Sequence, residues 1–283
     1  MMQRHTMPGA GFKQGDVAVR GYRLLYAIAG EGPVLVSLPG SAGLEMSRGK
    51  DLLARHCTVV ELNPPGWGPR NDVSGTMDQR ELADLLAEAL EALELGPCHL
   101  LGTSMGGVNA LWLALNHPGR VKSLILDAAM TFADPAHLRN PEGGAFIKGL
   151  SDGTIPPEAA QRVLADLPPA PRYPSKPFMD QAYFTDLMAK RMRMFPHFTN
   201  RHEDELDARA RDVRCPVLAL VGSDDEILKP EIREAYEARM PQARFELVAG
   251  GTHDLQGSHP EVFARLVGDF LAGAEAAARA ATS

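Results

Sequence analysis

The stretch Gly102-Thr103-Ser104-Met105-Gly106 constrains the fold of this chain more than any other. The apolar run before it, at 98–101, is typical of the end of a buried strand, and the run at 106–115 favours a helix packed closely on a sheet. A strand that turns abruptly into a helix strains the backbone of the residue at the apex, and the neighbouring positions must be small. We therefore predict a sharp turn at Ser104, with its hydroxyl clear of the backbone. The first amides of the following helix are expected to point toward it, where they can stabilise a negatively charged oxygen.

Strand and helix patterns alternate on both sides of this turn. The short apolar run at 34–38 is typical of a strand buried on both faces of a parallel sheet. Further strands are predicted at 58–62, 121–126, 217–221 and 244–248, and a strand pair turned at Gly21 is expected at 15–20 and 22–29. Helical patterns lie between them, at 44–55, 78–95, 230–240 and 260–272. The alternation predicts an α/β fold with a mostly parallel, doubly wound sheet. Sites in such sheets lie at the carboxyl ends of the strands.

The alternation breaks between residues 131 and 205. This segment is rich in proline, carries short helical patterns at 144–150, 157–167 and 177–194, and shows no strand pattern. We predict a helical cap, or lid, at 131–205, inserted into a core domain made of residues 1–130 and 206–283. The alanine-rich tail at 272–283 is expected to be frayed helix or disorder.

Charge and cysteine usage exclude several classes of protein. The net charge of −7 argues against nucleic acid or an anionic membrane as the main partner. No apolar segment approaches the roughly 18 residues that span a bilayer, and no apolar leader is evident at the N-terminus. Cys57, Cys98 and Cys215 lack metal-site spacing, and no zinc or phosphate-loop motif appears. We expect a soluble cytoplasmic protein with reduced thiols, no metal or cofactor, and a small-molecule partner.

Three side chains form the predicted catalytic set. A serine hydroxyl is a weak nucleophile at neutral pH, so Ser104 needs a base within hydrogen-bond reach, and a carboxylate must orient that base. His253 follows the last predicted strand and is the expected base. Asp225 follows the strand at 217–221 and is the expected acid, with Asp224 expected to face solvent or cap the loop. Asp127, which ends the strand after the turn's helix, remains an alternative acid.

Two backbone amides are predicted to form the oxyanion hole. One is the amide of Met105, directly after the serine, and the other is that of Ser41 in the small-residue loop at 39–43. Gly40 in the same loop lets backbone approach a substrate closely. Candidate substrate-lining side chains between the turn and the cap are Trp67, Phe146, Phe178, Met188 and Met192.

These motifs together resemble those of the α/β-hydrolase superfamily, in its serine-nucleophile branch. The likeness rests on the loop LPGSAG, the loop PPGWG, the nucleophile elbow GTSMGG, the acid loop GSDDEILKP and the closing GGTHDLQGSHPEVFARLVGDFL. The family places its catalytic acid three residues after the loop glycine, which selects Asp225. The chain departs from the family in Leu38-Pro39 where histidine is common, in Asn63 where aspartate is usual, and in Asp254 where an aromatic residue often follows the histidine.

The resemblance implies a catalytic triad that cleaves a small, largely apolar carboxylic ester through an acyl-enzyme. The serine-methionine-glycine-glycine elbow is similar to that of carboxylesterases and of serine hydrolases that cleave carbon–carbon bonds. The latter usually carry a cap arginine for a substrate carboxylate. Lys190, Arg191 or Arg193 could take this role, and the alternative for all three is a solvated face of the cap helix. Hydrolysis of a C–C bond, lactone or amide is therefore the alternative, and a ligand-binding sensor with this fold is the non-enzyme alternative.

Overall fold

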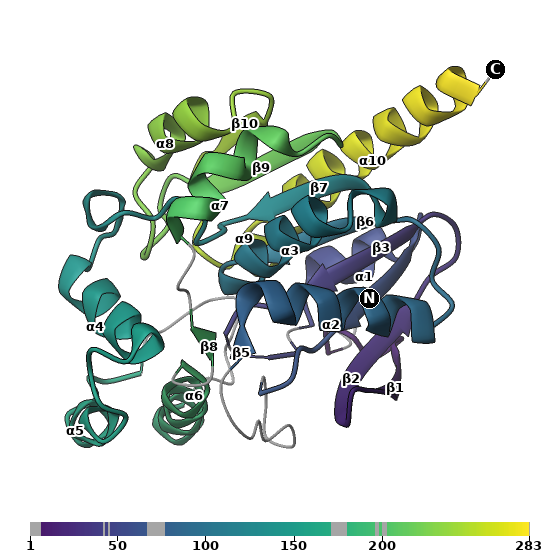
Figure 1. Cartoon of the computed structure of the whole chain (residues 1–283). Helices are drawn as coiled ribbons and strands as arrows, with labels where there is room; N and C mark the ends of the chain where they lie inside the picture. Colours follow the sequence, from purple (N-terminus) through teal and green to yellow (C-terminus); the bar gives the residue numbers. More distant parts are fainter. Residues whose placement is uncertain are drawn as a thin grey trace, which may run out of the picture.

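A sheet of eight strands forms the centre of the molecule (Figure 1). The computed structural model describes residues 7–41, 43–44, 46–66, 77–170, 180–195, 198–199 and 203–282. The strands run in the order β1 (Lys13–Val19), β2 (Tyr22–Ala29), β4 (Thr58–Leu62), β3 (Val34–Leu38), β6 (Cys98–Thr103), β7 (Val121–Asp127), β9 (Val217–Gly222) and β10 (Arg244–Val248). Pairing is antiparallel between β1 and β2 and between β2 and β4, and parallel from there on. This confirms the predicted fold class.

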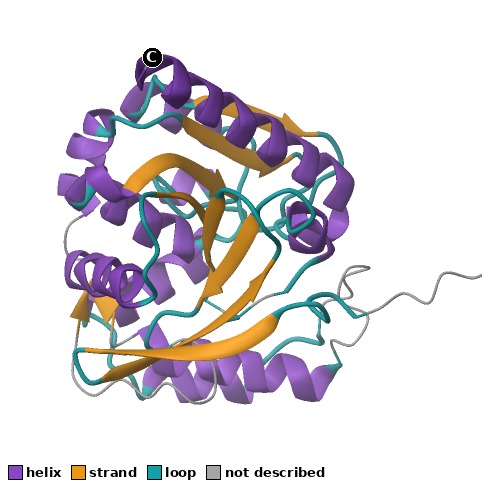
Figure 2. Ribbon diagram, turned by 90° about the vertical axis from the view of Figure 1, so that its right-hand side faces the viewer, coloured by secondary structure: helices purple, strands orange, loops and turns teal. Residues whose placement is uncertain are grey.

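Helices cover both faces of the sheet (Figure 2). One face carries α2 (Gln79–Ala92), α3 (Met105–Asn116) and α8 (Ile232–Arg239), and the other carries α1 (Arg48–Leu53), α9 (Leu255–Ser258) and α10 (Pro260–Thr282). Because successive strand residues point to opposite faces, Leu100 packs in the cluster of α2 and α3, while Leu101 packs in that of α10. The central strands β3, β4, β6, β7 and β9 are therefore buried on both faces, whereas the edge strands β1 and β10 are partly exposed.

At the carboxyl ends of the central strands, the residues that face α1 and α9 become polar. Ser37 in β3, Glu61 in β4 and Asp127 in β7 are fully buried. Lys50 of α1, also buried, lies 2.6 Å from Glu61 through its Nζ. We call Ser37, Lys50, Glu61 and Asp127 the buried polar layer. It lies on the α1 and α9 side of the sheet, and its member Asp127 accepts the Ser104 amide through its backbone carbonyl.

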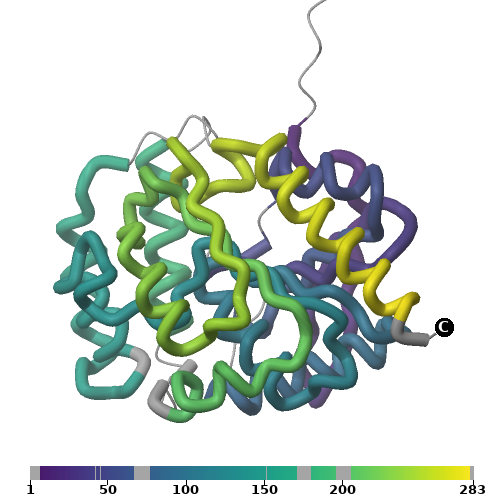
Figure 3. The backbone as a smooth tube through the Cα atoms, turned by 90° about the horizontal axis from the view of Figure 1, so that it is seen from above, coloured from purple at the N-terminus to yellow at the C-terminus, as the bar shows by residue number. Residues whose placement is uncertain are grey.

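The segment between β7 and β9 is mainly helical, as expected. It contains α4 (Pro141–Asp152), α5 (Ala159–Ala165), α6 (Gln181–Met194) and α7 (Glu203–Arg209), and α4 to α6 lie together beside the core (Figures 1 and 3). The expectation that it holds no strand is wrong: β8 (Phe198–Thr199) pairs in parallel with β5 (Met77–Asp78). A two-residue strand is too short to leave a periodic pattern. The division into cap and core at 131 and 205 stays a prediction.

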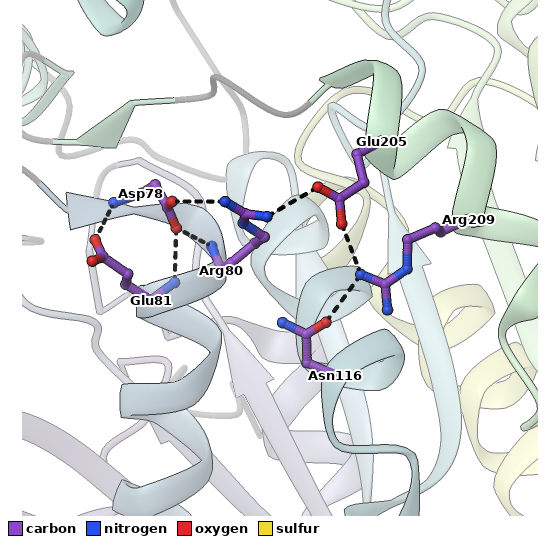
Figure 4. A network of polar contacts seen from close by, with 6 residues as sticks. All are labelled: Asp78, Arg80, Glu81, Asn116, Glu205 and Arg209. Carbon is purple, nitrogen blue, oxygen red and sulfur yellow. Dashed lines mark hydrogen bonds and ion pairs between the residues drawn. The ribbon is translucent and has the colours of Figure 1, made fainter.

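Charged side chains fasten α7 to the core helices (Figure 4). Arg80 at the start of α2 donates to Glu205 in α7 at 3.0 Å, and it also lies 3.5 Å from the capping carboxylate of Asp78. Arg209 of α7 donates to Glu205 and to Asn116 at the end of α3. These bonds hold α7, which ends the inserted segment, against the first turn of α2 and the end of α3.

The alanine-rich tail is helical, and α10 runs to Thr282 with its end extending away from the body (Figure 1). Glu275 accepts hydrogen bonds from His99 Nε2 at 3.1 Å and from Lys122 Nζ at 2.7 Å. These bonds hold the helix across the amino ends of β6 and β7, beyond the point where we expected it to end. No helix in the described ranges is both long and apolar enough to cross a membrane.

Candidate active site

Ser104 occupies the predicted strained turn between β6 and α3. Its φ of 52° and ψ of −119° lie in a region that residues with side chains rarely adopt. A Cβ on Gly102 would lie 2.5 Å from the carbonyl oxygen of Gly106, and one on Gly106 would lie 2.2 Å from that of Leu38. The Ser104 amide donates to the carbonyl of Asp127 at 3.0 Å, which holds the strained residue in place. The glycine spacing thus has the physical cause that the sequence suggested.

His253 and Asp225 meet at the carboxyl ends of β10 and β9. His253 Nδ1 donates to Asp225 Oδ2 at 2.9 Å and lies 3.1 Å from Oδ1. Oδ1 also accepts the backbone amides of Ile227 and Leu228, each at 2.8 Å. Asp225 is fully buried, whereas Asp224 is exposed and accepts a hydrogen bond from a neighbouring serine. Of the adjacent acids, Asp225 is therefore the one that contacts the histidine.

The electrostatic surroundings of His253 favour its protonated form. Burial alone would lower the pKa of the imidazole, but the hydrogen bond and negative charge of Asp225, with the charges of Glu226 and Asp127, hold that pKa above the ordinary value of 6.5. An imidazole so placed is a stronger base than a free histidine. It can accept a proton and keep the resulting charge stabilised.

Asp127, the alternative acid, lies at the end of β7 in a different network. Its Oδ2 accepts hydrogen bonds from Gln256 Nε2 at 2.7 Å and from Thr103 Oγ1 at 3.3 Å. Within the described part of the chain, its Oδ1 has no hydrogen-bond partner, and no bond joins it to His253. Burial raises the pKa of Asp127 to about 7. The geometry therefore favours Asp225 over Asp127 as the partner of the histidine.

The predicted oxyanion donors lie on either side of Ser104. Met105 is the first residue of α3, and Ser41 lies in the turn after β3. A Cβ on Gly40 would lie 3.3 Å from the Cβ of Ser104 and 3.9 Å from its Oγ, so this loop packs directly against the serine. Among the described residues, no hydrogen bond joins Ser104 Oγ to His253. The oxyanion roles and the triad as a whole stay predictions.

The five predicted substrate-lining side chains are only partly described. Trp67 and Phe178 lie outside the described residues. Met192 is 4% exposed within the main hydrophobic cluster, and Phe146 and Met188 are half-buried against the same cluster. Their packing is that of interior residues, and a role in substrate binding stays a prediction.

Two residues near the site went unnoticed in the sequence. Gln256 bonds Asp127, as described above. Arg139, at the start of the inserted segment, donates to the backbone carbonyls of Ser223 and Asp225, beside a β-bridge between Leu138 and Leu228. Arg139 carries no local signal, because its partners lie far away in the chain. Glutamine three positions after the histidine is the one clue that the sequence offers for Gln256.

No group of three or more histidine, cysteine, aspartate or glutamate side chains in the described part of the chain is arranged to hold a metal ion. The structure does bring together a strained serine, and a histidine hydrogen-bonded to a buried carboxylate, at the carboxyl edge of the sheet.

Comparisons with known proteins show the family and the fold. The sequence model of the alpha/beta hydrolase family matches residues 34–266. A protein of Caulobacter vibrioides named "Putative carbamate hydrolase RutD" is 27% identical over 259 residues, covering 87% of this chain and 93% of that protein. The 2-hydroxy-6-oxononadienedioate/2-hydroxy-6-oxononatrienedioate hydrolase of Paraburkholderia xenovorans is 28% identical over 282 residues, covering 92% of this chain and 93% of that protein.

Among solved structures, carboxylesterase CesB from Bacillus subtilis superimposes with a TM-score of 0.68 at 18% identity, covering 93% of this chain and 92% of that chain. At this identity the likeness concerns the fold.

Proposed function

Because the chain belongs to the alpha/beta hydrolase family, we propose that it is a serine hydrolase that cleaves a small, largely apolar carboxylic ester through an acyl-enzyme. Ser104 is the proposed nucleophile, His253 the base and Asp225 the acid. The substrate is a small molecule, and the reaction needs no metal or cofactor.

One observation carries this proposal. The His253–Asp225 hydrogen bond of 2.9 Å lies at the same edge of the sheet as the strained Ser104. The carboxylate holds the proton of the imidazole on Nδ1, which leaves Nε2 as the acceptor for the hydroxyl proton of the serine. Asp225 is fully buried, and among the described side chains its carboxylate contacts His253.

In the proposed reaction, Ser104 Oγ attacks the ester carbonyl while His253 Nε2 takes its proton. The tetrahedral oxyanion receives hydrogen bonds from the amides of Met105 and Ser41. His253 then gives the proton to the leaving alcohol. A water molecule, deprotonated by the same imidazole, attacks the acyl-enzyme and releases the acid and the free serine.

The test is hydrolysis of short-chain nitrophenyl esters by the wild type and by Ser104→Ala. We expect the substitution to abolish turnover. Ser37→Ala is the matched control, since it removes a buried hydroxyl from the neighbouring strand β3 whose Oγ has no partner in the described part of the chain. Full activity in Ser104→Ala would refute the proposal, and a wild type that binds but does not turn over substrates would favour a ligand sensor.

A second candidate is hydrolysis of a carbon–carbon bond or carbamate by the same machinery. It is favoured by the 27–28% identity, over most of the chain, to proteins named as a carbamate hydrolase and as a dienedioate hydrolase. Parallel assays with a ring-fission dienoate, a carbamate, a lactone and a nitrophenyl ester separate the candidates, because the same serine would give the highest kcat/KM with only one class of bond.

A further inference from the structure

Gln256 lies three residues after His253, in the single turn of α9, and its side chain is almost completely buried. Its amide Nε2 donates to Thr103 Oγ1 and to Asp127 Oδ2, each at 2.7 Å. Its Oε1 accepts a hydrogen bond from Ser47 Oγ at 3.0 Å. Both ends of the amide are therefore used, and the side chain has one defined orientation.

The two residues that accept hydrogen bonds from Gln256 Nε2 also hold the turn at Ser104. Thr103 directly precedes the serine, and the carbonyl of Asp127 accepts the Ser104 amide. Thr103 Oγ1 also donates to Asp127 Oδ2 at 3.3 Å, which closes a triangle of hydrogen bonds. Gln256 Nε2 therefore bonds the residue before Ser104 in the chain and the residue whose carbonyl accepts the Ser104 amide.

We propose that Gln256 is a positioning residue that sets the place of His253 relative to Ser104, through its hydrogen bonds to Thr103 and Asp127. The inference rests on the proposed function, because a serine hydrolase needs these two side chains at hydrogen-bond distance from each other. The loop that carries the base is tied by one amide to the turn that carries the nucleophile.

The direction of the bond explains why an amide is needed. Asp127 Oδ2 and Thr103 Oγ1 both require a donor from Gln256, which a carboxylate or an apolar side chain cannot supply. The charged groups whose fields act on Asp127 are Lys50, His253 and Asp254. A glutamate at position 256 would donate no hydrogen bond to Thr103 Oγ1, and it could bond Asp127 only by sharing a proton with it, so the link between the two loops would weaken.

Reversing donor and acceptor provides a sharp test. Gln256→Glu keeps the shape of the side chain but removes the donor. Asp127→Asn keeps an oxygen acceptor for Gln256. In the double variant Asp127→Asn/Gln256→Glu, the asparagine amide donates to the glutamate, and the bond is restored in the opposite direction. Ser47→Ala is the control, since it removes the third bond of Gln256 and leaves the bonds to Thr103 and Asp127 intact.

The measurement is the second-order rate constant for labelling of Ser104 by a fluorophosphonate, with the labelled residue identified by mass spectrometry and each melting temperature recorded. We expect Gln256→Glu to lower the rate about ten- to hundredfold, as a displaced catalytic group does, and the double variant to recover most of it. Ser47→Ala should lower the melting temperature and leave the labelling rate unchanged.

A wild-type rate in Gln256→Glu, or a loss that Asp127→Asn does not reverse, overturns the inference while the proposed function stands. A wild type that is not labelled at Ser104 overturns the proposed function and the inference with it.

Discussion

Asp225→Asn is the substitution whose effect the structure defines most fully. Asp225 Oδ1 accepts the backbone amides of Ile227 and Leu228 at 2.8 Å, so this position must remain an oxygen. In the asparagine variant, the NH₂ group is therefore forced into the place of Oδ2, which lies 2.9 Å from His253 Nδ1. Two donors cannot face each other at this distance, so Nδ1 must become the acceptor.

The consequence is the wrong tautomer of the histidine. With Nδ1 as acceptor, the imidazole carries its proton on Nε2 and cannot take the proton of Ser104. Substitutions of this type lower kcat by about 10⁴, which corresponds to about 5.5 kcal/mol of activation free energy. Because the backbone bonds at the Oδ1 position survive, we expect the melting temperature to fall much less than the rate does.

The assay is kcat and KM on the best nitrophenyl ester, with circular dichroism to check the fold. Asp127→Asn is the matched control, because it also replaces a buried carboxylate near the serine, and it keeps the oxygen that accepts from Gln256. We expect less than a tenfold change in kcat for this control, since Asp127 does not bond the histidine. If kcat fell by about 10⁴ in Asp127→Asn and not in Asp225→Asn, the assignment of the acid would be wrong.

Three further predictions concern pH and stability. The pH profile of kcat/KM should rise through an apparent pKa above 6.5, because the neutral imidazole is the active form and its surroundings raise the pKa of His253; an apparent pKa below 6 would contradict this. The pKa of Asp127 is about 7 in the folded state and near the ordinary 3.8 when unfolded, so the folded state binds more protons between these values. The free energy of unfolding should therefore fall by about 4 kcal/mol as pH rises from about 4 to about 7. In urea titrations, Asp127→Asn should lack this dependence on pH. Lys50→Met should lower the free energy of unfolding by about 3–5 kcal/mol, because it removes the partner of the buried Glu61 carboxylate, 2.6 Å away. The double variant Lys50→Met/Glu61→Leu should lower it less. Equal losses in urea unfolding would show that the ion pair is not the cause.

Local patterns in the sequence predict much of this fold. Strands β3, β4 and β10 begin and end where the sequence predicts, because each is bounded by turn residues. For the tail beyond residue 272 the sequence left frayed helix and disorder open, because the bonds of Glu275 to His99 and Lys122, which fasten this helix to the sheet, join residues far apart in the chain. Likewise β8 depends on a partner strand that is far away in the chain.

The candidate site shows the same division. Ser104, Asp225 and His253 can be predicted because each sits in a short motif at a strand end, and the contact of the last two follows from sheet topology. The proposed role of Gln256 cannot be predicted from the sequence, because it depends on a contact with Asp127, which is 129 positions away. The sequence favours Asp225 as the acid and keeps Asp127 as an alternative, and the hydrogen-bond partners of the two carboxylates support Asp225.

The bond between Gln256 and Thr103 spans 153 positions of the chain. During synthesis, the segment that contains Ser104 leaves the ribosome long before the segments that contain Asp225, His253 and Gln256. A nascent chain that ends in the inserted segment therefore carries the nucleophile without its base or its tether. On the proposed roles, a reactive serine first exists when the last parallel strand and α9 have docked, so partly made chains do not hydrolyse cellular esters.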